Sequence, residues 1–239
     1  MWEHLIAAIP AGWTQRSSGA ICGVTGIGMP TLNGVWVYDT GAGVKQVSRL
    51  LDRVADAGVP HVLQLCPRCD DSLRLLARSR EMHHDTSIPL MVLPDENEPS
   101  VVDDGNLVIR VLQPDEAIIL HADLAAAGFQ GPIDDFRRLM TPATLGRPGV
   151  CTYLGELDGE PVATGIGIRL NEHVGIFNVA TLPARRRRGY GAAITARAVR
   201  DGFQQGARLA WLQSSTDGYS VYERLGFTTL ESWQCWSST

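Results

Sequence analysis

The sequence has 239 residues, of which 44% are hydrophobic and 20% charged, and its formal net charge is −5. These values are typical of an ordinary globular protein and exclude a disordered or fibrous chain. A mildly acidic chain also makes a dedicated nucleic-acid-binding protein a poor match, because such a domain should be strongly basic. We therefore expect a globular protein without a nucleic-acid partner, and its length suits two small domains.

No apolar run reaches the roughly 20 residues that a bilayer-spanning helix needs. The apolar stretch 5–9 follows Glu3, at a place where a secretion signal carries basic residues. The five cysteines are an odd number, which suits reduced thiols better than a framework of disulfides. We therefore expect a cytoplasmic protein that does not engage a membrane.

The first part of the chain alternates strand and helix patterns. Short apolar runs predict strands, and apolar residues at helical spacing predict helices. In chain order the sequence predicts a strand over 34–38, a helix over 44–57, a strand over 62–65, a helix over 72–80 and a strand over 89–93.

A polar, acidic segment bounded by prolines follows these elements. Residues 94–99 read Pro-Asp-Glu-Asn-Glu-Pro, and residues 103–105 read Asp-Asp-Gly. Such a composition is typical of a linker. It predicts two domains, over residues 1–104 and 105–239.

The second part predicts antiparallel strands followed by alternating helices and strands. The turn residues Asp158 and Gly159 predict a hairpin between two of the strands. The expected strands cover 107–112, 150–157, 161–170, 174–181, 209–212 and 227–236, and the expected helices cover 114–127, 133–145, 189–205 and 219–225.

The order strand, helix, strand, helix, strand of residues 34–93 returns over residues 174–236. The segments Gly58–Leu65 and Gly206–Gln213 are also similar in sequence. We interpret this as an internal duplication. The alternative is that two segments with this order of elements look alike without a common origin.

The stretch from Asn178 to Ala192 joins a predicted strand to a predicted helix. Gly189 and Gly191 allow positive φ angles and let a ligand approach the backbone closely. The start of the helix offers free N–H groups and the positive end of the helix dipole, and Arg186 to Arg188 add positive charge. This pattern predicts a site for a diphosphate-bearing cofactor. The alternative for the arginine run is a solvated charge cluster or a nucleic-acid patch.

The glycine pattern is neither a Walker loop nor a dinucleotide-binding fingerprint, because the expected following residues and the preceding βαβ order are missing. Instead, two motifs together resemble those of the GCN5-related N-acetyltransferases, the GNAT superfamily. They are Arg186-x-x-Gly189-x-Gly191 after the strand ending Val179–Thr181, and Val221–Phe227, which reads Val-Tyr-Glu-Arg-Leu-Gly-Phe. The resemblance covers about residues 107–236. It implies an α/β (mixed α+β) GNAT fold with a central mixed sheet flanked by helices, preceded by a truncated GNAT-like repeat.

The resemblance further implies transfer of an acetyl group from acetyl-CoA to an amine, without a metal. The backbone of Val179, Ala180 and Thr181 would pair with the pantetheine arm, and the amides of Arg187 to Ala192 would cradle the pyrophosphate. A backbone N–H of this strand, such as that of Val179, would stabilise the oxyanion. Tyr222 would donate a proton to the departing thiolate. Ser215 stands where many members of the family have an asparagine, so its contact with the cofactor would differ. The implied cofactor-binding residues are Val179, Ala180, Thr181, Arg186, Arg187, Arg188, Gly189, Tyr190, Gly191, Ala192 and Ser215.

Several alternatives stay open on the sequence. Tyr222 is also explained as a half-buried core tyrosine. The general base is one of four polar residues or a chain of waters. A non-catalytic acyl-CoA-binding or sensing protein is the main alternative to the enzyme, and a longer acyl group or a hydroxyl acceptor is a third option. The acceptor would be a small-molecule or peptide amine, and the sequence is compatible with a homodimer. The four candidate bases are Glu156, His173, Asn178 and Asp217.

Two features of the first part carry no chemistry in this interpretation. Cys66-Pro-Arg-Cys69 has no second cysteine pair for zinc and no thioredoxin-like context, so we expect ordinary thiols at a strand–helix junction. The loop Asp39–Gly43 corresponds to the cofactor loop but lacks its arginines, and the counterpart of Tyr222 falls near Leu75 or Leu76. We therefore expect the first repeat to be inactive.

Overall fold

The computed structural model describes residues 3, 6, 8–99 and 106–238, and its contacts divide the chain into two compact units. Unit 1 comprises Met1–Pro89 together with Glu231–Thr239, and unit 2 comprises Leu90–Leu230. Unit 1 is thus built from two separate stretches of the chain, whereas the predicted first domain is a single stretch that ends at residue 104. The linker residues 103–105 lie outside the described residues. No helix in the described ranges is long and apolar enough to cross a membrane.

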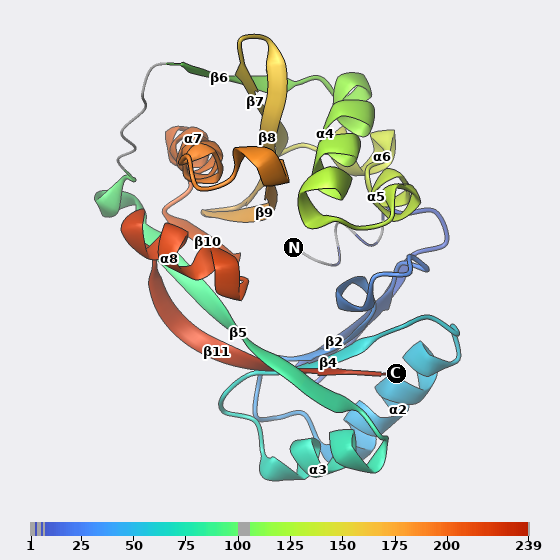
Figure 1. The fold of residues 1–239 in the computed structure, drawn as a ribbon. Helices are drawn as coiled ribbons and strands as arrows, with labels where there is room; N and C mark the ends of the chain where they lie inside the picture. Colours follow the sequence, from blue (N-terminus) through green and yellow to red (C-terminus); the bar gives the residue numbers. More distant parts are fainter. Residues whose placement is uncertain (1–2, 4–5, 7, 100–105, 239) are drawn as a thin grey trace. The chain divides into compact units, whose positions relative to one another are not determined.

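Among its described residues, unit 1 contains a mixed sheet of five strands and helices over Val44–Ala55 and Asp71–Ser79. The course of the chain can be followed in Figure 1. Its strand order is β1-β2-β3-β4-β11, in which β3 and β4 are parallel and the other neighbours are antiparallel. Helix α2 buries one face, and four of its apolar side chains join the core of the unit. The elements are β1 (Trp13–Ser17), β2 (Ala20–Val24), η1 (Pro30–Leu32), β3 (Gly34–Val37), α2 (Val44–Ala55), β4 (Val62–Leu65), α3 (Asp71–Ser79) and the last part of β11 (Thr228–Ser237).

Unit 2 contains a mixed sheet flanked by helices, as the sequence predicts. Its strand order is β5-β10-β9-β8-β7-β6, in which β9 and β10 are parallel and the other neighbours are antiparallel. The elements are the last part of β5 (His83–Pro94), η2 (Asp95–Asn97), β6 (Leu107–Leu112), α4 (Pro114–Phe129), α5 (Ile133–Leu139), α6 (Pro142–Leu145), β7 (Val150–Leu157), β8 (Glu160–Leu170), β9 (His173–Thr181), η3 (Pro183–Arg185), α7 (Tyr190–Gln204), β10 (Leu209–Gln213) and α8 (Thr216–Arg224).

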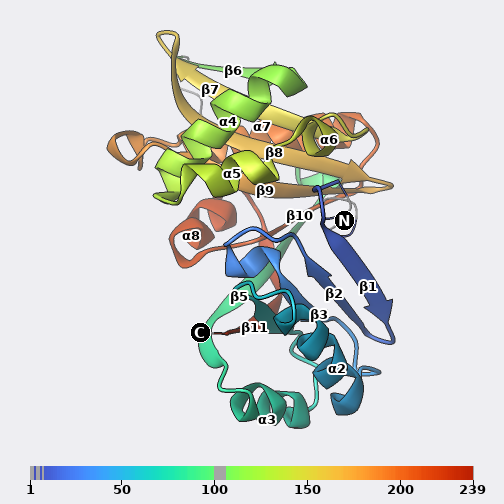
Figure 2. The same cartoon turned by 90° about the vertical axis from the view of Figure 1, so that its right-hand side faces the viewer.

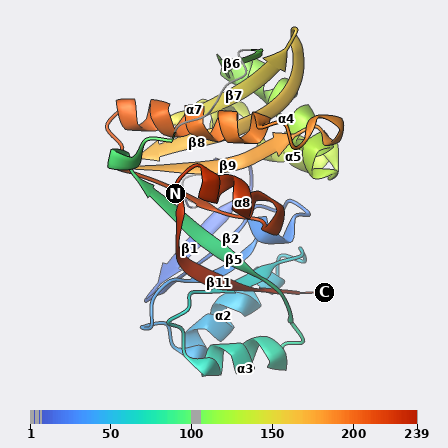
Figure 3. The same cartoon turned by 60° about the vertical axis from the view of Figure 1, so that its left-hand side comes forward.

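Helices cover both faces of the sheet of unit 2. Figure 2 shows α4 and α5 in front of this sheet, and Figure 3 shows α7 in front of it. Successive residues of β8 face opposite helices, because side chains alternate along a strand. Thr164 contacts His121 of α4, whereas a Cβ on Gly165 would lie 2.7 Å from Ile194 Cγ2 of α7. Glycine at 165 therefore lets α7 pack directly on β8.

Each sheet is completed by a strand from the other half of the sequence. Strand β5 follows α3 in the chain, but its residues Leu90–Pro94 pair with β10 in unit 2. Strand β11 follows α8, but its residues Gln234–Ser237 pair with β4 in unit 1. Both pairings are antiparallel, and Trp236 is 5% exposed within the core of unit 1. The strand that pairs with β4 in unit 1 therefore comes from the end of the sequence, and the strand that pairs with β10 in unit 2 comes from its first half.

The predicted helix over 133–145 is in fact two helices. Helix α5 ends at Leu139, and α6 starts again at Pro142. Thr141 breaks the helix because its backbone is extended and its side chain caps α6 by accepting a hydrogen bond from Thr144 N at 3.2 Å. The predicted hairpin turn is confirmed, since Asp158 and Gly159 have φ angles of 51° and 82°, as a type I′ turn requires.

The first part of the predicted linker is packed structure within unit 2. Pro94 is the last residue of β5, and residues 95–97 form the 3-10 helix η2. Asp95 N donates to Arg208 O at 3.0 Å, and the Asp95 carboxylate pairs with the Arg208 guanidinium at 2.9 Å. Asp95 of this acidic segment therefore forms a local ion pair, and the segment also connects β5 to the following residues.

A fully buried histidine lies between α4 and the sheet. Thr164 Oγ1 donates its single hydrogen to Tyr153 O at 2.8 Å, so it accepts from His121 Nδ1 at 2.6 Å. Among the described residues His121 Nε2 has no hydrogen-bond partner. Burial lowers the pKa of His121 from 6.5 to about 3, because a charged imidazole would lie in an apolar interior.

This histidine predicts a loss of stability in acid. The unfolded chain binds the proton near pH 6.5 and the folded protein only near pH 3, so protonation favours unfolding as the pH falls between these values. The expected contribution approaches about 1.4 kcal/mol per pH unit within this range. Urea unfolding at a series of pH values should show a shallower dependence for His121→Gln than for the unchanged protein. Equal slopes for both proteins would contradict a neutral, buried His121.

Candidate functional site

The parallel strands β9 and β10 pair only at one end. Their register comprises His173–Leu209, Val174–Ala210 and Gly175–Trp211, and no further β9–β10 pair follows in the described ranges. The second half of β9 therefore separates from β10 while it stays paired with β8 on its other side. An extended ligand can add to such a strand edge through backbone hydrogen bonds. The predicted pantetheine-binding residues Val179, Ala180 and Thr181 all lie on this separated half.

A β-bulge lies in the same half of β9. The register with β8 runs from Phe177–Ile166 directly to Ala180–Thr164, so Asn178 and Val179 together oppose the single residue Gly165. Asn178 has a φ angle of 48°, in the left-handed region that asparagine tolerates better than most residues. A bulge interrupts the regular ladder and redirects the backbone groups beside it. The bulge therefore includes Val179, the residue whose N–H would stabilise the oxyanion according to the GNAT resemblance.

The loop after β9 leads into an uncapped helix N-terminus. Gly189 is the N-cap of α7, with a φ angle of 85° and no side-chain cap. The first hydrogen bond of the helix runs from Ala193 N to Gly189 O at 2.9 Å, and the N–H groups of Tyr190, Gly191 and Ala192 have no hydrogen-bond acceptor among the described residues. A Cβ on Gly189 would meet no atom within 4 Å. The start of α7 is thus an open cradle of amides at the positive end of a helix, which fits a diphosphate.

The three arginines of the loop differ in their surroundings. The guanidinium of Arg186 donates to the main-chain oxygen of Gly128, at the end of α4, and Nε lies 3.5 Å from Thr181 O. Arg186 therefore ties the loop to α4. Arg187 and Arg188 are exposed, and Arg187 has a φ angle of 62°. Arg187 and Arg188 are therefore better placed than Arg186 to contact the phosphates of a cofactor.

Tyr190 contributes to this cradle through its backbone. Its side chain is 6% exposed and belongs to the hydrophobic core of unit 2. Anchoring this ring fixes the first turn of α7, and so holds the neighbouring amides in place. The GNAT resemblance implies that the backbone amides of Arg187 to Ala192 hold the cofactor, and the core position of the Tyr190 side chain is compatible with that prediction.

Tyr222 lies on α8, partly buried against the core of unit 2. Its ring packs edge-on against Phe227, with ring centroids 6.0 Å apart and an angle of 65° between the planes. Burial raises the pKa of Tyr222 to about 12, because the phenolate would lose its hydration. The hydroxyl therefore keeps its proton at neutral pH, as a proton donor requires. A core role alone is also compatible with this packing.

Ser215 is the N-cap of α8. Its hydroxyl oxygen accepts a hydrogen bond from Gly218 N at 3.2 Å, which satisfies one of the free amides of the helix. The side chain thus holds the helix that carries Tyr222. Gly218, one turn before Tyr222, also lies close to the tyrosine ring, since a Cβ at 218 would lie 2.9 Å from Tyr222 Cε2. Gly218 was not among the predicted site residues, although its spacing of four residues from Tyr222 places it one helical turn away.

The four candidate bases are scattered over unit 2. Glu156, on β7, accepts a hydrogen bond from Arg110 Nε at 3.2 Å and is therefore already paired. His173 is exposed at the start of β9, at the end of the strand opposite to Thr181, and Asp217 is exposed in the first turn of α8. Only Asn178 lies in the bulged half of β9. Within the described residues, no three His, Cys, Asp or Glu side chains gather where they could hold a metal ion.

Comparisons with known proteins agree with this geometry. Residues 119–227, all within unit 2, match the model of the acetyltransferase (GNAT) family. A search of curated proteins gave no match.

Solved structures share the fold over nearly the whole chain. A GCN5-related N-acetyltransferase from Kribbella flavida has a TM-score of 0.74 at 20% identity, covering 98% of this chain and 91% of that one. One from Sphaerobacter thermophilus has a TM-score of 0.69 at 16% identity, covering 92% and 76%. A tandem GNAT protein from the clavulanic acid biosynthesis pathway has a TM-score of 0.61 at 14% identity, covering 96% and 84%. Residues 119–227 therefore match the acetyltransferase (GNAT) family, and the described structure shares its fold with these solved structures.

Proposed function

We propose that unit 2 transfers an acetyl group from acetyl-CoA to a primary amine by direct attack in a ternary complex. The observation that carries this proposal is the uncapped start of α7 next to the bulged half of β9. Three amides without acceptors, an open space above Gly189 and two exposed arginines suit the diphosphate of coenzyme A. The backbone of Val179, Ala180 and Thr181 would hold the pantetheine arm as an added strand.

In this proposal the amine nitrogen attacks the thioester carbon, a C–N bond forms and the C–S bond breaks. Negative charge gathers first on the carbonyl oxygen, and the N–H of Val179 at the bulge would stabilise it. The charge then passes to sulfur, which takes the proton of Tyr222, and Tyr222 regains a proton from solvent. The proton that the amine loses goes to solvent, because no single base stands out among the candidates. Tyr222 suits its role because burial keeps its hydroxyl protonated at neutral pH.

The test is the release of free coenzyme A thiol from acetyl-CoA by the full chain, measured with a panel of small amines and peptides. Turnover with at least one amine, together with the acetylated product by mass spectrometry, would support the enzyme. Calorimetric binding of acetyl-CoA without turnover on any acceptor would favour the acyl-CoA-sensing alternative. Absence of acetyl-CoA binding would contradict both the acetyltransferase and the acyl-CoA-sensing protein.

Gly218 provides a test of how Tyr222 is positioned. In Gly218→Ala the new Cβ, built 2.9 Å from Tyr222 Cε2, should displace the ring. We expect a several-fold loss of kcat with little change in stability, because the helix preference for alanine over glycine, about 0.5–1 kcal/mol, offsets the tight contacts of the new Cβ with Tyr222 and with Ser215 Oγ, 3.3 Å away. Adding Gly218→Ala to Tyr222→Phe should then cause little further loss. Ser220→Ala, an exposed change on the same helix, serves as the control. Full additivity of the two changes would contradict a role through Tyr222.

We also propose that unit 1 is a degenerate GNAT-like repeat that binds no coenzyme A. Its strands β1 to β4 and helix α2 follow the same order and directions as β7 to β10 and α7. In the loop before α2, the Asp39 carboxylate accepts the Gly41 N–H at 2.8 Å, which places a negative charge where a phosphate would need amides. Leu75, near the counterpart of Tyr222, is 62% exposed. Calorimetry should therefore find one acetyl-CoA per chain, and two would contradict the proposal.

A further inference from the structure

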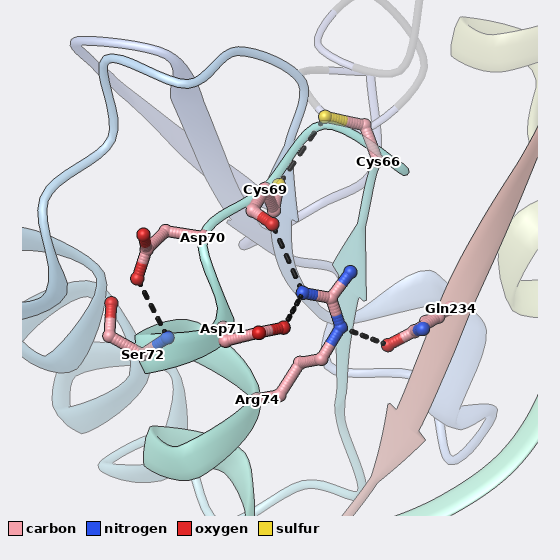
Figure 4. Close-up of polar contacts among 7 residues, drawn as sticks. All are labelled: Cys66, Cys69, Asp70, Asp71, Ser72, Arg74 and Gln234. Atoms are coloured by element: carbon pink, nitrogen blue, oxygen red, sulfur yellow. Dashed lines mark hydrogen bonds and ion pairs between the residues drawn. The ribbon is translucent and has the colours of Figure 1, made fainter.

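The Cys66–Cys69 segment forms a tight turn between β4 and α3 in unit 1 (Figure 4). Cys69 N donates to Cys66 O at 3.1 Å, which closes a four-residue turn. The two sulfurs lie 3.3 Å apart and face each other. Cys66 is itself fixed to the sheet, since its N–H donates to Val37 O at 3.0 Å.

This geometry is close to that of a disulfide. A closed four-residue turn keeps its first and last Cα atoms within about 7 Å, and disulfides span Cα distances of about 4.4–6.8 Å. The sulfurs must approach from 3.3 Å to the bonded distance of about 2.05 Å, which small side-chain rotations can achieve. Bond formation therefore needs no change in the course of the backbone.

Polar contacts hold the turn on both sides. The Asp70 side chain caps α3 by accepting from Ser72 N at 2.8 Å. Arg74 donates to Cys69 O at 3.1 Å and to the Gln234 side chain at 3.0 Å, as Figure 4 shows. Arg68, within the turn, pairs with Glu231. The facing arrangement of the two thiols is thus built by side chains of the turn, of α3 and of β11.

The surroundings favour a covalent pair over a metal site. Zinc binding needs four ligands, and the described residues contain no group of three that could hold a metal. Burial raises the pKa of Cys69 to about 12, so this sulfur is a thiol at neutral pH. Both cysteines are buried, and Cys69, at 5% exposed, is the less buried residue of the pair.

We propose that Cys66 and Cys69 are a reversible dithiol–disulfide site that reacts with small-molecule disulfides. Cys69 sulfur, after losing its proton, attacks the external disulfide, forms a mixed disulfide and releases one thiolate. Cys66 sulfur, after losing its proton, attacks Cys69 sulfur, closes the Cys66–Cys69 bond and releases the second thiolate. The two protons end on the two released thiols, so the protein is oxidised by two electrons and the external disulfide is reduced by two. This site is independent of acetyl transfer by unit 2.

The experiment equilibrates the full chain with oxidised and reduced glutathione, stops the exchange with acid, alkylates the free thiols in denaturant and maps the products by mass spectrometry. We expect two of the five thiols to become protected under oxidising conditions, with Cys66 joined to Cys69, and to return with excess reduced glutathione. The reaction should be slow at neutral pH. Its rate should rise about tenfold per pH unit, because the thiolate fraction of Cys69 rises by the same factor. Five free thiols after full equilibration, or protection of another pair, would overturn the proposal.

Single-residue variants separate the first attack by Cys69 from the second attack by Cys66. Cys66→Ser should accumulate the glutathione mixed disulfide at Cys69, because the second step is missing. Cys69→Ser should stay unmodified at residue 66, because that sulfur is buried. Cys151→Ser is the matched control, since Cys151 is half-buried in unit 2 and its loss should leave the protection of two thiols unchanged. Modification of Cys66 in folded Cys69→Ser, with folding checked by circular dichroism, would contradict the order of the two steps.

Discussion

Tyr222→Phe should lower kcat by about 10²-fold or more, the usual contribution of a positioned general acid. The affinity for acetyl-CoA should stay close to that of the unchanged protein, because the ring still packs against Phe227 and the core. Single-turnover rates and calorimetry on the same preparations would separate the two quantities. Because the pKa of Tyr222 is about 12, its deprotonation should not limit the rate of the unchanged enzyme at neutral or mildly alkaline pH.

Tyr219→Phe is the matched control for this experiment. Tyr219 lies on the same helix, three residues earlier, and its hydroxyl lies 3.1 Å from Thr229 Oγ1 at an exposed position. Its loss should leave kcat almost unchanged. Equal rates for Tyr222→Phe and the unchanged protein would assign Tyr222 to the core alone, and the departing sulfur would then take its proton from water.

Gly189→Val is expected to weaken acetyl-CoA binding by at least about tenfold, or 1.4 kcal/mol. The φ angle of 85° at Gly189 is strained for any side chain and most of all for a β-branched one. The new side chain would also project into the open space above the amides of α7, where the diphosphate is expected. Calorimetric titration with coenzyme A measures the effect directly.

The other end of α7 offers a matched control for this glycine. Gly206 has a φ angle of 94°, and a Cβ there would also meet no atom within 4 Å. Gly206→Val therefore imposes a similar backbone strain on the same helix, and both variants should lose similar stability. Only Gly189→Val should lose coenzyme A. A comparable loss of affinity in both variants would show that strain in α7, and not the cradle, is responsible.

Much of the fold could be predicted because its elements follow simple periodic patterns. The bounds of β4, β6 and β7 agree with the prediction to the residue, since each is a mainly apolar run that is followed by turn residues or by a proline. Strands β1 and β2 escaped prediction because Trp13–Ser17 is largely polar and Gly23 interrupts the apolar run Ala20–Val24. The exchange of β5 and β11 between the units also could not be predicted, because nothing local distinguishes which sheet a strand joins.

The candidate site shows a similar division. The sequence predicts the amide cradle, since glycines and arginines before a helix are typical of an anion site. It does not reveal that Arg186 bonds to Gly128 or that Ser215 caps α8, because both depend on contacts formed by folding. The bulge could have been suspected from Asn178, a residue tolerant of positive φ within an otherwise apolar strand. His121 gave no signal, since a buried and an exposed histidine look alike in a sequence.

The discontinuous make-up of unit 1 has a consequence for biosynthesis. At about 5–20 residues per second, a ribosome needs on the order of ten seconds to make unit 2 before it reaches residue 231. During that interval β4, buried along its whole length in the finished protein, has no β11 beside it. An open apolar strand edge of this kind invites pairing with other nascent chains. Chaperone binding to the emerging polypeptide should therefore be concentrated on residues 62–65 until translation supplies Gln234–Ser237.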